Sequence, residues 1–380
     1  MDIKKNILSW ENDMQLPRSD ILDIAHFSRL FDNKSECYKL FWFQAIARKI
    51  KEGQKTITFE TLIDEMIVDA WYMVLEYRLN LGPNDALERV VHRLGEISNM
   101  KSCEKKEVVL EYLKVCNDKE VITMKRTLSQ NVPYRLQAPF MESMKGAEWN
   151  RSGKNLAARI NQEQRLMYYF LQFSGLNTQI QIQGEWADYI ERNYEIIQEW
   201  VELNLIQYLQ RRNPSVPGIV DKLYPPKERN LEKVKRYWKM LVSIKPVCEI
   251  YGENPLSEKN ISIDHFVPWS YVAHDELWNL IPTTRSINSS KSNSLPDWNR
   301  YFPMLCKMEY LSYELMWEYP EVHKSFDKCA KEHLNNPEIR HKLYQGGLSE
   351  TEFSRRLEEV MFPVYQSAKS MGFSSWSLRT

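Results

Sequence analysis

The sequence of 380 residues contains no apolar run approaching the roughly 20 residues that a membrane-spanning helix requires. Its first residues, MDIKKNILSWEND, have no uninterrupted apolar core and no small-residue cleavage site, so they do not resemble a secretory signal. Hydrophobic residues make up 43% of the chain and charged residues 27%, which allows a sizeable core and a hydrated surface. We therefore expect a cytoplasmic protein with no membrane association.

The sequence also lacks paired cysteines of the kind that cross-link small secreted domains. Its six cysteines are scattered along the chain, which is typical of a reducing compartment. They are Cys37, Cys103, Cys116, Cys248, Cys306 and Cys329.

A third absence is net charge, because 51 basic residues are balanced by 51 acidic ones. Proteins that bind nucleic acid without a partner usually carry a basic face, since phosphate contacts dominate their affinity. Either the basic charge is therefore local here, or something else delivers the substrate. Residues 145–165 have a net charge of +3 and residues 227–239 a net charge of +4, although most such runs are solvated helix faces.

Apolar residues at helical spacing predict that residues 1–225 are mostly α-helical. The clearest stripe runs through residues 58–80, and Asp85 with Glu88 forms a potential capping box for the next helix. Further helices are predicted at 37–50, 104–116, 160–174 and 184–212. Proline and glycine pairs between residues 213 and 226 then interrupt the pattern, and a domain boundary is placed there.

Residues 227–300 show a different order, in which a basic helix is followed by a strand, a loop, a second strand and a polar helix. The strands are predicted within ISIDHFVPWS and WNLIPTT, and Thr283 or Thr284 is expected to cap the helix TTRSINSSKSN. Residues 301–380 return to amphipathic helices. The sequence thus predicts a mainly α protein with three parts: a helical regulatory or partner-binding domain (1–225), a small module (226–300) and a helical extension (301–380).

Two sets of potential metal ligands are better explained as ordinary structure. Four acidic residues on the predicted helix 58–80 lie mainly opposite its apolar stripe, so a solvated face explains them better than a metal site. They are Glu60, Asp64, Glu65 and Asp69. Cys329 and His333 are four residues apart, but a zinc site would need two more ligands.

Asp264, His265 and Asn288 offer what phosphodiester hydrolysis needs. A histidine can take a proton from water near neutral pH, and a hard divalent cation on the phosphate would prefer carboxylate or amide oxygens. Adjacent strand residues point to opposite sides, so Asp264 and His265 are expected to diverge toward the cation and the scissile phosphate. A helix starting near residue 284 would return Asn288 to the cation.

This pattern resembles the HNH, or ββα-metal, endonuclease family over about residues 245–300. It is most similar to the variant with asparagine as the third motif residue, as in the HNH domain of RNA-guided CRISPR nucleases. The matching positions are Asp264, His265, Pro268, Asn279, Leu280, Asn288, Lys291 and Pro296. The resemblance implies that Asp264 and Asn288 bind Mg²⁺ or Mn²⁺, that His265 is the general base, and that Asn279 holds the hairpin and orients the histidine.

The chain departs from the family in one respect. Many members bind a structural zinc ion through two Cys-x-x-Cys pairs, but here Tyr251 stands where Cys248 would need its partner, and no later pair follows. We therefore expect no structural zinc. Arg285 and Lys291 share spacings of three with Asn288 and are candidates for contacting substrate phosphate, although a solvated helix face explains each nearly as well.

Three functions remain open from the sequence. The first is a metal-dependent DNA endonuclease, and the resemblance alone implies a bacterial anti-phage defence or restriction component. The second is an RNase toxin that uses the same site, and the third is a catalytically silent module that binds nucleic acid or a partner. Because the chain is neutral and an unrestrained endonuclease would attack the host genome, we expect residues 1–225 to restrain the site or to await a protein partner, self-association or a small signal.

Overall fold

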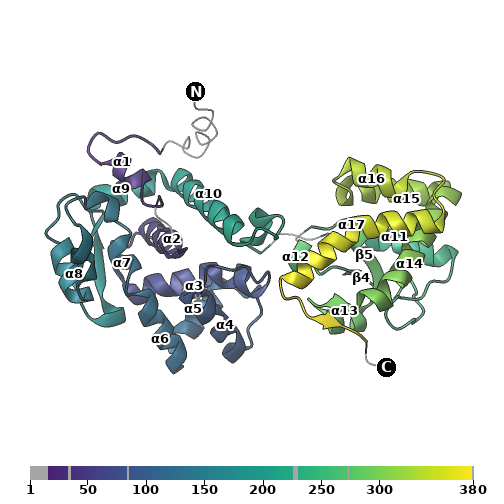
Figure 1. Cartoon of the computed structure of the whole chain (residues 1–380), viewed down its shortest axis with the longest axis horizontal. Coiled ribbons are helices and arrows are strands. Elements are labelled where there is room, and N and C mark those ends of the chain that lie inside the picture. The colour runs from purple at the N-terminus through teal and green to yellow at the C-terminus, as the bar shows by residue number, and fades with distance from the viewer. Residues whose placement is uncertain (1–15, 33–35, 84, 226–229, 273, 379–380) are drawn as a thin grey trace. The chain divides into compact units, whose positions relative to one another are not determined.

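The computed structural model describes residues 16–32, 36–83, 85–225, 230–272 and 274–378. It divides the chain into two compact units between Pro214 and Ser215 (Figure 1). Both units are built chiefly of helices, which confirms the predicted mainly α class. No helix in the described ranges is long and apolar enough to cross a bilayer. The amino-terminal segment used for the signal prediction, and residues 227–229 of the basic run, lie outside the described residues.

The first unit is organised around helix α3, which packs against α2, α4 and α5. Its helices are α1 (Ile24–Ser28), α2 (Tyr38–Lys51), α3 (Phe59–Leu75), α4 (Ala86–Ser98), α5 (Lys106–Val115), α6 (Lys119–Leu128), α7 (Val132–Arg135), α8 (Gly153–Ile160), α9 (Gly184–Arg192) and α10 (Tyr194–Arg212), with 3₁₀ turns at Ala138–Phe140, Gly146–Asn150 and Gly175–Asn177. Asp85 caps α4 as predicted, because its carboxylate accepts from the N–H groups of Leu87 and Glu88, but Glu88 accepts from the N–H of Leu81 and does not complete the capping box.

A three-stranded antiparallel sheet also belongs to this unit, with β3 (Gln179–Ile182) between β1 (Thr56–Thr58) and β2 (Tyr168–Gln172). The helix predicted over 160–174 is therefore wrong. The side chain of Gln137 bonds both the N–H and the C=O of Tyr168, and such long-range partners leave no mark on local periodicity. The helix predicted over 184–212 is interrupted at Asn193, so α9 and α10 are separate.

Three of the four acidic residues of α3, Asp64, Glu65 and Asp69, are not on a solvated face, contrary to the sequence interpretation, whereas the Glu60 side chain is 45% exposed. Arg48 and Lys49 of α2 and Lys106 of α5 all form ion pairs with Glu65, whose side chain is only 2% exposed. Burial opposes ionisation of this carboxyl, but the three cations outweigh it and lower the pKa of Glu65 to about 2. The acidic face of α3 thus faces neighbouring helices, which supply the compensating charge.

The second unit contains the predicted strands and the C-terminal helices around them (Figure 1). Its elements are α11 (Glu232–Ile244), β4 (Ile261–His265), α12 (Trp269–Val272), β5 (Leu280–Thr284), α13 (Arg285–Lys291), β6 (Leu295–Pro296), α14 (Trp298–Glu318), α15 (Pro320–His333), α16 (Pro337–Tyr344), α17 (Glu350–Ser370) and β7 (Ser375–Trp376), with 3₁₀ turns at Ile219–Lys222 and Leu277–Asn279. One hydrophobic core runs from Val234 to Phe373. Residues on both sides of the boundary predicted at 300 contribute to this core.

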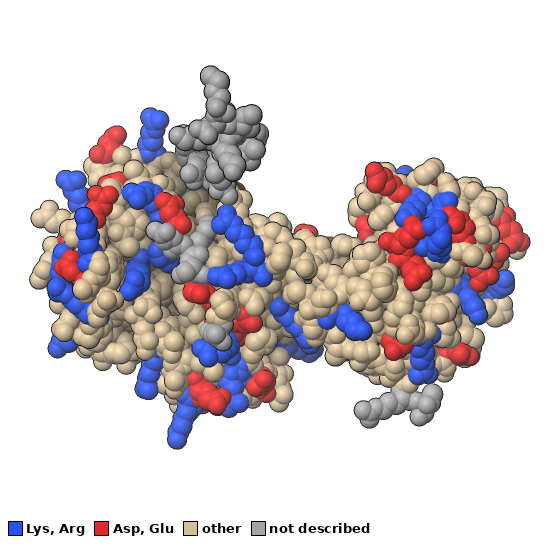
Figure 2. Space-filling model, viewed as in Figure 1, with Lys and Arg blue, Asp and Glu red and all other residues tan. Residues whose placement is uncertain are grey.

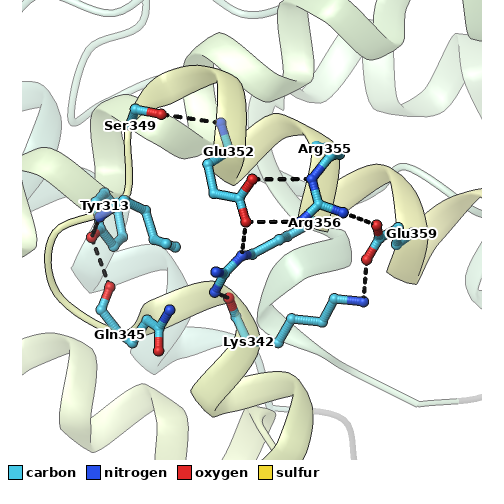
Figure 3. A network of polar contacts seen from close by, with 9 residues as sticks. Tyr313, Lys342, Gln345, Ser349, Glu352, Arg355, Arg356 and Glu359 are labelled. Atoms are coloured by element: carbon cyan, nitrogen blue, oxygen red, sulfur yellow. Dashed lines mark hydrogen bonds and ion pairs between the residues drawn. The ribbon is translucent and has the colours of Figure 1, made fainter.

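Helices α16 and α17 are joined by a surface network in which every cation drawn meets an acceptor (Figure 3). Glu352 accepts from Arg355 and Arg356, and Glu359 pairs with Arg355 and Lys342. Arg356 also donates to the backbone oxygen of Lys342. Basic and acidic side chains are similarly interspersed elsewhere on the face shown in Figure 2.

Glu309 of α14 is an unusual member of the second core, because its side chain is buried and its Oε1 has no hydrogen-bond partner among the described residues. Burial raises the pKa of Glu309 from 4.5 to about 8. Between these two values the folded state holds a proton that the unfolded chain releases, so the free energy of unfolding falls as the pH rises through this window.

We expect Glu309→Gln to stabilise the protein by on the order of 3 kcal/mol near pH 7, because the amide needs no proton to remain neutral. The check is thermal unfolding followed by circular dichroism at about pH 5, 6.5 and 8. The advantage of the variant should grow from the lowest to the highest pH. Parallel pH curves for the two proteins would contradict this account.

Candidate active site

Strands β4 and β5 form an antiparallel hairpin that leads directly into helix α13, as the sequence predicted. The register places His265 opposite Leu280 and Ile261 opposite Thr284. The Thr284 hydroxyl then caps α13 by accepting from the N–H of Ile287. The order strand, strand, helix is therefore set by local signals, namely β-branched residues in the strands and a threonine at the helix start.

Asn288 ties α13 to β4 beside Asp264. Its side-chain nitrogen donates to the backbone oxygen of Ile263 at 2.9 Å and to the Ser262 hydroxyl at 3.1 Å. Because Ile263 directly precedes Asp264, these bonds bring the asparagine side chain to the strand position next to the carboxylate. The amide nitrogen is engaged with the strand, so the amide oxygen is the atom of Asn288 suited to bind a cation.

Asp264 is held by partners on both carboxylate oxygens and is only 4% exposed. The Tyr251 hydroxyl donates to one oxygen at 2.8 Å, and the Lys291 ammonium donates to the other at 3.1 Å. Lys291 also donates to the backbone oxygen of His265 at 2.7 Å. Each carboxylate oxygen has a second lone pair, so these bonds orient Asp264 without using all of its capacity to bind a cation.

Lys291 was a candidate for contacting substrate phosphate, but its side chain does not lie on the surface of α13. Its side chain is completely buried, whereas Arg285 at the start of the same helix is exposed. Burial lowers the pKa of Lys291, and the neighbouring Asp264 carboxylate opposes that effect. Each step of three residues turns the helix face by about 60°, so Arg285 and Lys291 are too far apart around the helix to share one face with Asn288.

The oxygen donors of Asp264 and Asn288 fit a hard divalent cation. Mg²⁺ commonly binds proteins through one or two side-chain oxygens and completes its octahedron with water and phosphate. Over the described ranges no group of three or more His, Cys, Asp or Glu residues is arranged to hold a metal ion. Carboxylate and amide oxygens suit Mg²⁺ or Mn²⁺ better than zinc, which more often takes nitrogen and sulfur ligands.

His265 is paired with a residue that the sequence analysis missed. Its Nε2 lies 2.7 Å from Oδ1 of Asp275, in the segment just before the 3₁₀ turn Leu277–Asn279. His333 of α15 lies on the other side of this segment, with its Nδ1 at 2.9 Å from the backbone oxygen of Asp275. A carboxylate at Nε2 favours a proton on that nitrogen, which makes Nδ1 the basic atom of the His265 ring.

We expect Asp275→Asn to slow cleavage about 10–100-fold and to move the acidic limb of the pH–rate profile to lower pH, because the carboxylate that favours a protonated imidazole is gone. The measurement is the cleavage rate from about pH 5 to 8. Asp327→Asn, which removes an exposed carboxylate of α15, is the matched control. An equal loss of rate at every pH would instead indicate a purely structural role for Asp275.

Asn279 is completely buried, and its side chain forms hydrogen bonds with the backbone just after β4. Its side chain accepts from the N–H of Val267 at 2.8 Å and donates to the backbone oxygen of the same residue at 2.9 Å. Its own backbone oxygen accepts from the N–H of Phe266 at 3.0 Å. These bonds fix the two residues that follow His265, so any effect of Asn279 on catalysis stays a prediction that acts through the position of the histidine.

A turn centred on Glu249 occupies the place where the family usually has its first cysteine pair. The Glu249 carboxylate accepts from the N–H groups of Tyr251, Gly252 and Asn254 at 2.7 to 3.0 Å. This turn places the Tyr251 hydroxyl on Asp264. The sequence analysis noted Tyr251 only as a missing cysteine, because its contact with Asp264 spans thirteen residues and depends on the folded turn.

Neither a curated protein nor a solved structure matches this chain. The site segment does have a match. The HNH endonuclease family model matches residues 249–297, which hold the Glu249 turn, both strands and α13, and this confirms the family resemblance predicted for that segment.

Proposed function

We propose that this protein is a metal-dependent endonuclease that hydrolyses phosphodiester bonds in DNA. The observation that carries the proposal is the juxtaposition of two oxygen donors and a carboxylate-paired histidine on the β4–β5 hairpin and the helix α13 that follows it. Asn288 is bonded to the residue before Asp264, and His265 follows Asp264 directly. The family match at residues 249–297 supports a nuclease, and the choice of DNA is part of the proposal.

In this proposal His265 accepts a proton from the attacking water at Nδ1, while Asp275 holds the opposite ring nitrogen. A divalent cation held by Asp264 and Asn288 would supply charge neutralisation at the phosphate and the leaving oxygen. Lys291 keeps the Asp264 carboxylate and the His265 backbone in place. Arg285 is exposed at the start of α13 and is available for a phosphate contact.

The test is incubation of the full chain with supercoiled plasmid, single-stranded DNA and structured RNA in the presence of Mg²⁺. We expect the full chain alone to cut plasmid weakly or not at all at physiological salt, and we expect cleavage by the full chain or by residues 215–380 to stop with EDTA and with His265→Ala. Cleavage confined to RNA would replace the DNA assignment with the RNase alternative. If none of the substrates were cut by the full chain or by residues 215–380, the silent-module alternative would take the place of the nuclease.

We further propose that the helical first unit controls cutting, directly or through a partner or self-association, as part of an anti-phage or restriction function. The support is electrostatic, because residues 215–380 carry 22 Lys or Arg and 21 Asp or Glu, so this unit has little general attraction for a polyanion. The test compares the rates of plasmid cleavage by the full chain and by residues 215–380 at about 150 mM salt. Rapid multiple-turnover cutting by the full chain alone would contradict the proposed restraint.

A further inference from the structure

A groove between α11 and α15 gathers basic side chains from two segments that are almost ninety residues apart in the sequence. Lys233 and Arg236 come from α11, and Lys324 and Lys328 come from α15. The hollow between them measures ≈ 580 Å³. Its lining is completed by apolar or small side chains and one carboxylate: Met240, Ser325, Cys329 and Glu321.

Among the described residues, three of the four cations in this groove form no ion pair, although the Glu321 carboxylate is part of the same lining. Lys233 pairs with Glu332, but across the described part of the chain Arg236, Lys324 and Lys328 form no ion pair with a carboxylate. The α16–α17 network of the same unit shows the opposite arrangement, since each of its cations meets a carboxylate (Figure 3). Lys324 and Lys328 are also like charges one helical turn apart, which repel each other unless an anion lies between them.

Both walls of the groove are attached to the catalytic hairpin. On α11, the indole nitrogen of Trp238 donates to the backbone oxygen of Leu280, the residue paired with His265. On α15, His333 lies one turn beyond Cys329 of the groove and contacts the backbone of Asp275. The groove therefore keeps a fixed position relative to His265 within the second unit.

We propose that this groove binds the phosphate backbone of the nucleic acid that the HNH site cuts, an inference that rests on the proposed function. Lys324 and Lys328 have Cβ atoms about 5–6 Å apart and long flexible side chains, so they can contact neighbouring phosphates of one strand. A concave channel between two helices fits a strand better than the flat surface of a bilayer. The groove also supplies the local basic surface that a chain of zero net charge needs.

The experiment measures binding of a fluorescently labelled DNA duplex to the full chain by anisotropy, over a range of salt concentrations. All proteins carry His265→Ala so that the probe stays intact. The groove variant adds Lys324→Gln and Lys328→Gln. Its matched control adds Lys307→Gln and Lys369→Gln, which remove the same charge from exposed positions of α14 and α17.

Loss of two phosphate contacts should weaken binding about tenfold or more and reduce the slope of log affinity against log salt by about 2. The control should bind as the parent does. Equal weakening in both variants, or in neither, would overturn the groove as a specific binding surface. A groove variant that loses affinity for phosphatidylserine vesicles but not for DNA, single-stranded DNA or RNA probes would also overturn it.

The two proposals fail in different ways. Groove-dependent binding, together with no cleavage of any probe by the full chain or by residues 215–380 when His265 is restored, would support the groove and contradict the nuclease. Cleavage that requires His265 but is unchanged by the groove substitutions, together with unchanged binding, would support the nuclease and overturn the groove.

Discussion

The chain carrying His265→Ala should cut nucleic acid about 10²–10⁴-fold more slowly than the wild type, because the water loses its general base. The remaining donors, Asp264 and Asn288, are unaffected, so the response to Mg²⁺ should keep its midpoint even as the maximal rate falls. The measurement is single-turnover cleavage with protein in excess over plasmid. This design removes product release from the observed rate.

A suitable control is His323→Ala on α15, since its side chain is 38% exposed and contacts Asp327 and the ring of Trp317, away from the site. It should cut at the wild-type rate. If His265→Ala also did so, the base would have to be another group and the assignment made from the motif would be wrong. Unfolding curves of both variants show whether loss of the buried His265 ring has affected the fold.

The second large effect should come from the cation donors. Asn288→Ala should require more Mg²⁺ or Mn²⁺ for half-maximal cleavage, because one oxygen ligand is lost while the carboxylate remains. Asp264→Ala should abolish the response to either cation. It should also destabilise the protein by about 3–5 kcal/mol, because it leaves the buried Lys291 ammonium without its carboxylate.

These two consequences of Asp264→Ala are separable. The double variant Asp264→Ala/Lys291→Met removes both buried charges, so it should recover much of the lost stability while remaining inactive. Activity that returned with stability would show that Asp264 serves only the fold. Unchanged cation titrations for both Asn288→Ala and Asp264→Ala would remove the basis for the proposed cation site.

The sequence was sufficient for the parts of the site that depend on neighbouring residues. The two strands and the Thr284-capped helix follow from β-branched alternation and a helix-start signal, and their order brings Asn288 to the strand beside Asp264. The helix predicted over 160–174 failed because β2 owes its conformation to partners far away in the sequence.

The parts that the sequence did not reveal are contacts between separate elements. Asp275 is recognisable as part of the site only from its contact with His265 in the folded protein. Helix α15 supports this contact, because its His333 lies against the backbone oxygen of Asp275. The burial of Lys291 and the charge pairing of Glu65 have the same origin. In each case a polar residue that is usually solvated meets a partner on another element, and no local pattern encodes that contact.

The second unit joins a short family segment to a much larger core, and this affects how its activity would respond to random mutation. The family match ends at residue 297, whereas the core that supports the hairpin continues through α14 and α17 to Phe373. Leu305, Phe353 and Leu357 are fully buried in that core, and truncating such side chains typically costs 2–5 kcal/mol. In a genetic screen for loss of cutting, inactivating substitutions should therefore extend well beyond the motif into α14 and α17, where they would act by lowering the amount of folded protein.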